Sequence, residues 1–351
     1  MPKNKFSKIS SILNDAKKGK MFILVDDKNR ENEGDLIIPG SKCNSKSINF
    51  MAKHGRGLIC LALTKKQVDN LKLPLMSSIN KSRMQTAFTI SIEAKKGITT
   101  GISAHDRAKT IKTAIDPKVK KSDIVSPGHV FPLVARSGGV LERAGHTEAS
   151  VDISKLSNLN PSSVICEVMN EDGRMARLND LFKFSKKHKI KLASIEDLIS
   201  YRLKYEKLVK KLNYKSSIIK KIGKVNIYTY KNKLENNTNF VITKGKFNQK
   251  KSIPVRVLSY KILNRNILIN NRVQKSLKAM VKYKSFLLLI INNKNNISKG
   301  NSINTLRYYG IGAQIIKDLN IRNMILISRR KKKIIGLEGF GLKIKKQIIV
   351  K

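Results

Sequence analysis

MFILVDDKNRENEGDLII, residues 21–38, is the stretch that decides the fold of the first half of the chain. Residues 21–25 form an unbroken apolar run of the length typical of a buried strand. An acidic turn with a glycine follows at 26–35, and the apolar run at 36–38 predicts a second strand. The stretch therefore predicts a buried strand that leads directly into a cluster of carboxylates.

Short apolar runs alternate with amphipathic stretches through the first 205 residues, a pattern typical of a mixed α/β layer structure. Besides the strands above, it predicts strands at 58–63, 86–92 and 163–169 and helices at 7–18, 46–53, 103–115, 147–156, 176–188 and 194–204. The fold class is therefore α/β (α+β), with a mixed-sheet domain and flanking helices followed by a smaller α+β domain.

The length of 351 residues suits two domains, each large enough to bury its own core. Residues 206–223 are charged and lack a sustained apolar period, so we expect a basic linker there, between a first domain at 1–205 and a second at 224–351. In the second domain the pattern predicts strands at 225–230, 239–245, 253–260 and 286–292, and a turn followed by a helix within 301–319.

The formal net charge of +48 would ordinarily indicate a nucleic-acid partner. Residues 206–351 hold 35 basic and 4 acidic residues, whereas residues 1–205 hold 37 and 20. The lysines are scattered among asparagine and isoleucine without a zinc finger or an aromatic ribonucleoprotein motif, as an AT-rich coding sequence would produce. Nucleic acid is therefore not the expected partner.

The sequence indicates neither export nor a membrane. Its first residues lack the apolar core of a secretory signal, and its longest apolar runs, such as FLLLII at 286–291, are far shorter than the roughly 20 residues that cross a bilayer. The cysteines Cys43, Cys60 and Cys166 have no paired spacing, which predicts reduced thiols. We therefore expect a soluble, cytoplasmic protein.

Five carboxylates crowd the turn after the first strand: Asp26, Asp27, Glu31, Glu33 and Asp35. Such a cluster repels itself unless a cation neutralises it, and Mg²⁺ prefers carboxylate and water oxygens as ligands. A solvated acidic turn is the alternative, but a concentrated acidic cluster stands out in a chain this basic. The turn is therefore a candidate metal site.

Residues 126–148, SPGHVFPLVARSGGVLERAGHTE, predict a loop that binds phosphate and metal. Glycines let backbone N–H groups approach an anion, and Arg143 and Thr147 add side-chain donors. A helix beginning near Thr147 would point its positive end at the same anion. Taken alone, either histidine of the segment, His129 or His146, is as well explained as a packed or surface residue.

Glu167 lies in the apolar run that predicts a strand at 163–169. A buried carboxylate is costly unless it is paired or metal-bound, and burial raises its pKa toward the range useful for proton transfer. Glu167 is therefore a candidate general acid or base. On an edge strand it would simply face water.

Together these segments resemble 3,4-dihydroxy-2-butanone 4-phosphate synthase over residues 7–203. The resemblance rests on long motifs in the right order, namely DDKNRENEGDL, HGRGLICLAL, TAFTISIEAKKGITTGISAHDRAKTI, SPGHVFPLVARSGGVLERAGHTEASVDI and ICEVMNEDGRMAR. Ser-Pro-Gly precedes His129 where the family pattern has Arg-Pro-Gly, a departure that removes no catalytic group.

The resemblance implies a mixed-sheet α/β lyase of riboflavin biosynthesis. Such an enzyme converts D-ribulose 5-phosphate to 3,4-dihydroxy-2-butanone 4-phosphate and formate through enolisation, dehydration and rearrangement. The resemblance also implies two Mg²⁺ or Mn²⁺ ions per active site, which act as Lewis acids on the sugar oxygens, and a homodimer.

Carried over position by position, the resemblance assigns roles to individual residues. Glu31 and His146 match metal ligands. The substrate-binding positions are Arg30, Glu31, Asp35, Glu167 and the run Arg143, Ala144, Gly145, His146 and Thr147. His129 and Glu167 match residues of proton transfer, and Glu33 and Cys60 match further catalytic positions.

The second domain resembles GTP cyclohydrolase II, most clearly at RYYGIGAQIIKDLNI (307–321) and GLEGFGLKI (336–344). The zinc site of that family uses three cysteine thiolates, and no cysteine follows Cys166, so we expect no zinc. The stretches IINNKNNISKG (290–300) and SRRKKK (328–333) replace its catalytic and nucleotide-binding segments. We therefore predict a degenerate domain without GTP cyclohydrolase activity.

An alternative from another class is a basic RNA- or partner-binding remnant of a bifunctional riboflavin enzyme. It predicts that the carboxylates of the first half have also been lost, but they are present. All five histidines lie in the first domain, so the second domain has no imidazole for an unusual zinc site either. Turnover combined with weak RNA binding would exclude the remnant.

Overall fold

The computed structural model describes residues 6–350 except 29, 82–83, 234–236, 249–250, 263–266, 294–301 and 331–339, and of 302–306 it describes only the backbone. Much of the three stretches 290–300, 328–333 and 336–344 discussed above therefore lies outside the described residues. The chain divides into two compact units, Met1–Ile199 and Ser200–Lys351.

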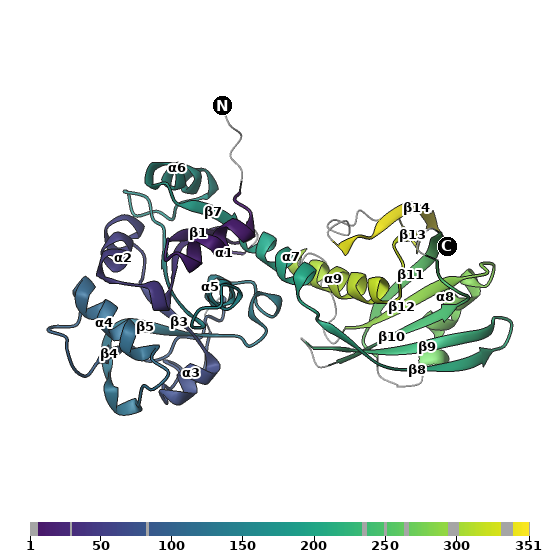
Figure 1. Cartoon of the computed structure of the whole chain (residues 1–351), viewed down its shortest axis with the longest axis horizontal. Coiled ribbons are helices and arrows are strands. Elements are labelled where there is room, and N and C mark those ends of the chain that lie inside the picture. Colours follow the sequence, from purple (N-terminus) through teal and green to yellow (C-terminus); the bar gives the residue numbers. More distant parts are fainter. Residues whose placement is uncertain are drawn as a thin grey trace. The chain divides into compact units, whose positions relative to one another are not determined.

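The first unit is built on a seven-stranded sheet with the strand order β4-β5-β3-β6-β2-β1-β7 (Figure 1). Its strands are β1 (Phe22–Val25), β2 (Gly34–Pro39), β3 (Cys60–Thr64), β4 (Ile92–Ala94), β5 (Ile124–Ala135), β6 (Ser162–Glu167) and β7 (Lys191–Ser194). β3 pairs with β5 and β1 with β7 in parallel, and the other neighbours are antiparallel. The predicted mixed sheet is confirmed.

Helices cover both faces of this sheet. They are α1 (Ile9–Lys17), α2 (Ser45–Phe50), α3 (Lys65–Asn70), α4 (Ala104–Ala114), α5 (His146–Leu156), α6 (Leu178–His188) and α7 (Ile195–Tyr205). α2, α4 and α6 contribute Ile48, Ile111 and Leu181 to the main core on one face, where Ile23 and Val25 of β1 also point. α5 lies on the opposite face.

α5 approaches the sheet closely because both surfaces carry small side chains. Val151 of the helix packs against Ala62 of β3 and Ala135 of β5. The Ser163 hydroxyl of β6 donates a hydrogen bond of 2.9 Å to the Ser150 carbonyl of the helix. The fit fixes the position of the helix, and with it the position of the helix N-terminus over the sheet.

Two predictions in this unit were partly wrong. Much of the segment 126–148, predicted as a loop, belongs to β5, because β3 and β4 pair with it on both sides despite its glycine and prolines. The strand expected at 86–92 is only β4, which begins at Ile92, and Phe88 and Thr89 before it form isolated bridges.

The second unit has its own seven-stranded sheet, in the order β14-β13-β11-β12-β10-β9-β8 (Figure 1). Its strands are β8 (Val209–Ile219), β9 (Gly223–Asn232), β10 (Asn237–Lys244), β11 (Ser252–Tyr260), β12 (Phe286–Asn292), β13 (Asn323–Ser328) and β14 (Lys343–Ile349). The run from β8 through β9 and β10 to β12 is antiparallel, and the run from β12 through β11 and β13 to β14 is parallel.

Two separate cores flank this second sheet. α9 (Ser302–Asp318) contributes Ile311 and Ile315 to the core on one face. α8 (Asn271–Met280) contributes Val273 and Leu277 to the core on the other. The predicted α+β architecture of this half is confirmed.

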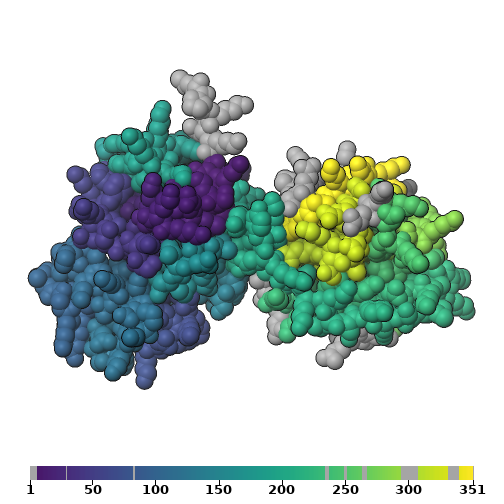
Figure 2. Space-filling view, in the orientation of Figure 1, coloured from purple at the N-terminus to yellow at the C-terminus, as the bar shows by residue number. Residues whose placement is uncertain are grey.

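The basic linker predicted at 206–223 is wrong for most of its length. Residues 209–219 form β8, which lies at the edge of the sheet and pairs with β9. Most residues of β8 are exposed, so the strand lacks the apolar alternation that would have revealed it in the sequence. Figure 2 shows β8 and β9 as a continuous band on the surface of this unit.

Candidate active site

Three of the predicted site residues lie on one face of the first sheet, toward one of its ends. Cys60 of β3 pairs with Phe131 of β5 and with Ile165 of β6. Side chains two residues apart on a strand share a face, so His129 lies on the same face as Phe131, and Glu167 on the same face as Ile165. His129 and Glu167 therefore lie on one face of the sheet and toward the same end. Their strands are two strand spacings, or about 10 Å, apart. This is the face that α5 covers.

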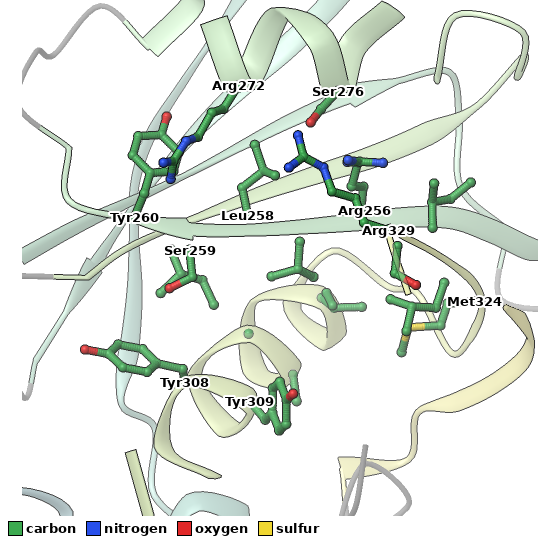
Figure 3. Close-up of a pocket in the computed structure, with 18 of the residues that line it drawn as sticks. Arg256, Leu258, Ser259, Tyr260, Arg272, Ser276, Tyr308, Tyr309, Met324 and Arg329 are labelled. Carbon is green, nitrogen blue, oxygen red and sulfur yellow. The ribbon is translucent and has the colours of Figure 1, made fainter. Parts of the chain in front are cut away.

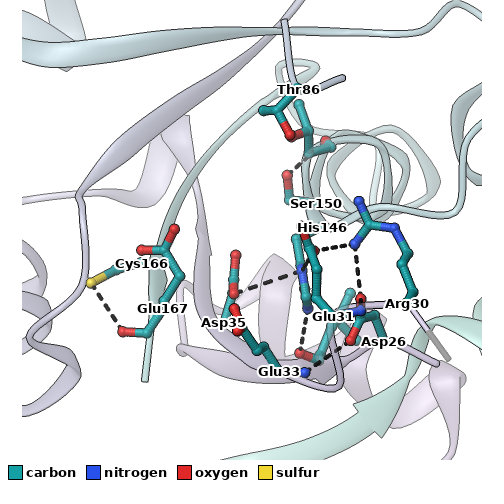
Figure 4. Close-up of polar contacts among 12 residues, drawn as sticks. Asp26, Arg30, Glu31, Glu33, Asp35, Thr86, His146, Ser150, Cys166 and Glu167 are labelled. Carbon is teal, nitrogen blue, oxygen red and sulfur yellow. Dashed lines mark hydrogen bonds and ion pairs between the residues drawn. The ribbon is translucent and has the colours of Figure 1, made fainter. Parts of the chain in front are cut away.

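Asp35 lies directly opposite Glu167 in the pairing of β2 with β6, so the two carboxylates are neighbours (Figure 4). Glu167 Oε2 accepts a hydrogen bond of 2.8 Å from the Leu58 backbone N–H. A Cβ at Gly57 would lie 2.5 Å from the same oxygen, so glycine leaves the room for this carboxylate. Because β6 is the central strand, Glu167 is not on an edge strand.

The acidic loop between β1 and β2 is organised by the buried side chain of Asp26. Its carboxylate accepts hydrogen bonds from the backbone N–H groups of Glu31 (3.1 Å) and Glu33 (2.9 Å) and from Arg30 Nη1 (2.8 Å). Arg30 also pairs with the Glu31 carboxylate. Arg177, the N-cap residue of α6, donates a hydrogen bond of 2.8 Å from Nη1 to the Glu31 carbonyl. The loop is therefore held in a defined shape.

Asp26, Glu31 and His146 each offer one ligand atom, and the three atoms lie within 4.8 Å of one another. Among the residues that the structure describes, this is the one such group of three His, Cys, Asp or Glu side chains. Both Asp26 oxygens already accept hydrogen bonds from N–H groups, so Glu31 and His146 are better able than Asp26 to donate a lone pair to a cation. Carboxylate oxygen and imidazole nitrogen together suit a divalent cation.

His146 is oriented by a single hydrogen bond. Its Nε2 lies 3.2 Å from the Leu24 carbonyl oxygen, and a carbonyl can only accept, so Nε2 carries the proton. The lone pair is then on Nδ1, which lies 3.9 Å from Glu31 Oε2 and 3.7 Å from Asp35 Oδ1. Burial lowers the pKa of His146 to about 4, against the opposing effect of Asp26. A neutral nitrogen thus faces two carboxylates (Figure 4).

An anion can be held at the start of α5. A Cβ at Gly145 would lie 2.4 Å from Arg143 Nη1 and 2.9 Å from Arg30 Nη2, so both guanidinium groups converge on this glycine. Gly145 is the N-cap residue of α5, and the N–H groups of the first helical turn, including that of Thr147, attract negative charge. Glu148 Oε2 accepts a hydrogen bond of 2.6 Å from Arg143 Nη1.

His129 lies apart from this cluster. It is half-exposed on β5, and its Nδ1 pairs with the carboxylate of Glu93 on β4. Glu93 was not predicted from the sequence, because nothing in the motif marks a carboxylate 36 residues away as the partner of this histidine.

Burial dominates the electrostatics of the site. Burial is the largest cause of the raised pKa values of Glu33 and Glu167. The pKa of Asp35 is raised most strongly, first by burial and then by the charge of Glu167. Burial, followed by the charge of Glu167, also raises the pKa of Cys60 well above its usual range, so Cys60 is a thiol and no nucleophile at neutral pH. A divalent cation would relieve the repulsion among the carboxylates.

The structure thus brings most predicted site residues together and adds two. Those that converge are Arg30, Glu31, Glu33, Asp35, Glu167 and the run from Arg143 through the buried Ala144 to Thr147. His129 and Cys60 share the sheet face. The residues that sequence reasoning did not assign to the site are Glu93 and Arg177, whereas Asp26 belongs to the acidic turn that was predicted as a metal site.

The fold and the site define an α/β enzyme with a carboxylate-rich, anion-attracting site at one end of a mixed sheet. The family model of 3,4-dihydroxy-2-butanone 4-phosphate synthase matches residues 10–201, and that of GTP cyclohydrolase II matches residues 291–349. The chain therefore belongs to the 3,4-dihydroxy-2-butanone 4-phosphate synthase family.

Relatives match along the whole chain. The riboflavin biosynthesis protein RibBA of Aquifex aeolicus is 43% identical, over 99% of this chain and 93% of its own. The 3,4-dihydroxy-2-butanone 4-phosphate synthase of Photobacterium phosphoreum is 41% identical, over 96% of this chain and 98% of its own. The crystal structure of a two-domain synthase from A. baumannii aligns with a TM-score of 0.81 at 37% identity, over 98% of this chain and 99% of that one.

No helix in the described part of the chain is long and apolar enough to span a membrane.

Proposed function

We propose that the chain converts D-ribulose 5-phosphate to 3,4-dihydroxy-2-butanone 4-phosphate and formate with the help of divalent cations. The observation that carries the proposal is the neutral Nδ1 of His146 facing the carboxylates of Glu31 and Asp35 beside the start of α5. Formate accounts for the one carbon, two hydrogens and two oxygens by which substrate and product differ.

The donor set fits a hard divalent cation, with Glu31 and His146 as its ligands. A structure of a 3,4-dihydroxy-2-butanone 4-phosphate synthase in complex with two magnesium ions supports Mg²⁺, and it aligns at 37% identity and a TM-score of 0.55 over 57% of this chain and 98% of that one. When bound, such a cation would supply Lewis acidity that stabilises negative charge on the sugar oxygens. Mn²⁺ has the same ligand preference.

The phosphate of the substrate belongs at the N-terminus of α5. Arg30 and Arg143 supply charged donors there, and Gly145 and Thr147 supply backbone N–H groups beside them. A phosphate at this position would direct the sugar chain toward the carboxylates beside His146, which include Asp35.

Glu167 and His129 are the groups that we assign to proton transfer. Burial raises the pKa of Glu167, so that this carboxyl holds a proton closer to neutral pH than an exposed one does. The Glu93 carboxylate pairs with Nδ1 of His129 and so fixes the orientation of the ring. Glu33 adds a carboxylate within the acidic loop, and Cys60 contributes a thiol on the sheet face below the site.

For the second unit we propose a supporting role without GTP cyclohydrolase activity. The sequence offers no cysteine or histidine after residue 188 with which to build a zinc site.

We also propose a homodimer in solution, to be checked by light scattering coupled to size-exclusion chromatography.

The reaction is tested by supplying the intact chain with Mg²⁺ and ¹³C-labelled D-ribulose 5-phosphate and following the products by NMR. We expect formate and a four-carbon phosphate in equal amounts. Folded, Mg²⁺-loaded protein that releases no formate would refute the proposal, and a salt-sensitive complex with generic RNA would then favour the basic remnant.

A further inference from the structure

The two outermost strands of the second unit, β8 and β9, carry positive charge that no acidic residue balances. Residues 209–232, which form these strands and the turn between them, contain seven lysines and no aspartate or glutamate. The sequence alone predicts no nucleic-acid partner, because the lysines are scattered and no aromatic motif accompanies them. The pairing of β8 with β9, however, places some of these lysines beside tyrosines on the surface of the unit (Figure 2).

The register of β8 with β9 defines one group of neighbouring side chains, because residues that pair across two strands share a face of the sheet. Tyr214 pairs with Tyr228, and Ile218 pairs with Lys224. Residues four apart on one strand also share a face, so these four side chains lie together. The Lys211 ammonium nitrogen joins them, 5.4 Å from the centre of the Tyr228 ring. We call these five residues the tyrosine face.

The tyrosine face is open to solvent beside the core to which α9 contributes. Tyr230, two residues along β9 from Tyr228 and on the same side, is buried in that core, and Tyr228 packs against the margin of the core. Tyr214 is 65% exposed and Ile218 is 83% exposed. The rings of Tyr214 and Tyr228 stack, with their centres 5.6 Å apart and their planes at 27°. Exposed apolar side chains that form one patch indicate a binding surface.

We propose that the tyrosine face binds single-stranded nucleic acid without sequence preference. An exposed aromatic ring can stack with any base, and lysines beside the ring neutralise the phosphates. Along the two strands Tyr214 lies between Lys211 and Lys224, so one strand of nucleic acid can contact all three. A second copy of the chain suits this surface less well, because the seven lysines of each copy would repel one another. An acidic protein segment would match the charge but would leave the stacked rings without a role.

The tyrosine face is independent of the synthase site, because all of its residues belong to the second unit. It is also separate from the cavity that Figure 3 shows beside β11 and α8, which Arg272 and other arginines line. β11 lies three strand spacings, or about 14 Å, from β9 in the sheet. Arg272 is exposed, so Arg272→Gln removes a positive charge of the same unit away from the tyrosine face and serves as the control.

The test is fluorescence anisotropy of a labelled oligouridine of about 20 nucleotides, titrated with the intact chain at several salt concentrations between about 50 and 200 mM. Oligothymidine of the same length, an RNA duplex and poly-L-glutamate are added as unlabelled competitors. The two single strands should compete, and the stronger competitor identifies RNA or DNA as the source of the ligand. The duplex should compete more weakly, because its bases are not free to stack on tyrosine.

Variants separate stacking from charge. Tyr214→Ala should weaken binding of oligouridine by at least about fivefold, whereas Tyr214→Phe keeps the ring and should bind as the natural chain does. Replacing Lys211 and Lys224 together by glutamine should lower the slope of log Kd against log salt by about 1.4, since each phosphate contact to a single strand contributes about 0.7. Arg272→Gln should leave the slope unchanged. All of these residues are exposed and outside the synthase site, so the unfolding temperature and formate release should equal those of the natural chain.

Three results would overturn the proposal. Equal binding by Tyr214→Ala and the natural chain would remove the role of stacking, and an unchanged slope in the double lysine variant would remove the phosphate contacts. Competition by poly-L-glutamate as strong as that by oligothymidine, at equal charge concentration, would identify an acidic protein as the partner instead.

Discussion

At the scale of single residues, His146 shows how burial and one hydrogen bond prepare a side chain. The Leu24 carbonyl fixes the proton on Nε2, and burial lowers the pKa of His146 from 6.5 to about 4. The unfolded chain therefore binds a proton at His146 between these pH values, where the folded chain does not. The contribution of His146 to stability is accordingly lost as the pH falls from 6.5 toward 4.

This gives a prediction for the metal-free protein. Between pH 7.5 and 4.5 the natural chain should lose roughly 2 to 3 kcal/mol more free energy of unfolding than His146→Gln, since one unit of pKa shift corresponds to about 1.4 kcal/mol. Urea unfolding of both proteins in a chelator measures the difference. Equal losses in the two proteins would show that His146 is not held neutral.

Glu167 and His129 carry the second residue-scale prediction. Glu167→Gln or His129→Gln should lower kcat for formate release by about 10² to 10⁴-fold, the usual range for loss of a general acid or base. Neither is assigned as a metal ligand, so Mg²⁺ should still raise the unfolding temperature of both variants. Glu171→Gln, an exposed carboxylate outside the site, is the control and should retain full activity. A fully active Glu167→Gln enzyme would exclude the assigned role.

At the scale of secondary-structure elements, the close packing of α5 on the sheet sets the geometry of the site. Ala62→Leu would force a larger side chain between β3 and Val151, and we expect a loss of about 1 to 3 kcal/mol of unfolding free energy. Activity should fall as well, because the start of α5 would be displaced. Ala52→Leu, at an exposed position, is the control and should change neither the unfolding free energy nor the activity by much. Equal urea midpoints for the two variants would contradict this account.

Elements with their own periodic pattern could be predicted from the sequence, and those fixed by neighbours could not. β1, β6 and α5 start and end within two residues of expectation, because β1 and β6 contain apolar runs of strand length and α5 is amphipathic. The sequence predicts a loop over most of β5, because the prolines and glycine hide a strand that pairing with its two neighbours stabilises. β8 was missed because an exposed edge strand needs no apolar face.

The same distinction applies to the site. The motifs contain Glu31, His146 and Glu167, so the sequence identified them. The orienting groups, Glu93 and Arg177, act through contacts between segments far apart in the chain, which a single sequence does not reveal.

At the scale of the whole molecule, the two units differ in the side chains that they offer for metal binding. The second unit has the fold of its relatives but lacks the thiolates and imidazoles of a zinc site, so the purified chain should contain no stoichiometric zinc and should not open the ring of GTP. Elemental analysis and absorbance spectroscopy with GTP, with and without added Zn²⁺, check both points. Zinc-dependent consumption of GTP would contradict the degenerate assignment.

The central claim is that the first unit is a divalent-metal-dependent synthase whose cation is held by Glu31 and His146. Its most direct test is formate release from D-ribulose 5-phosphate by the intact chain, with Mg²⁺ and with chelator, compared with Glu31→Gln, His146→Gln and the Glu171→Gln control. We predict formate from the natural chain and the control only when Mg²⁺ is present, and a loss of at least about 100-fold in both site variants. Full activity in chelator, or in folded Glu31→Gln and His146→Gln proteins, would contradict the claim.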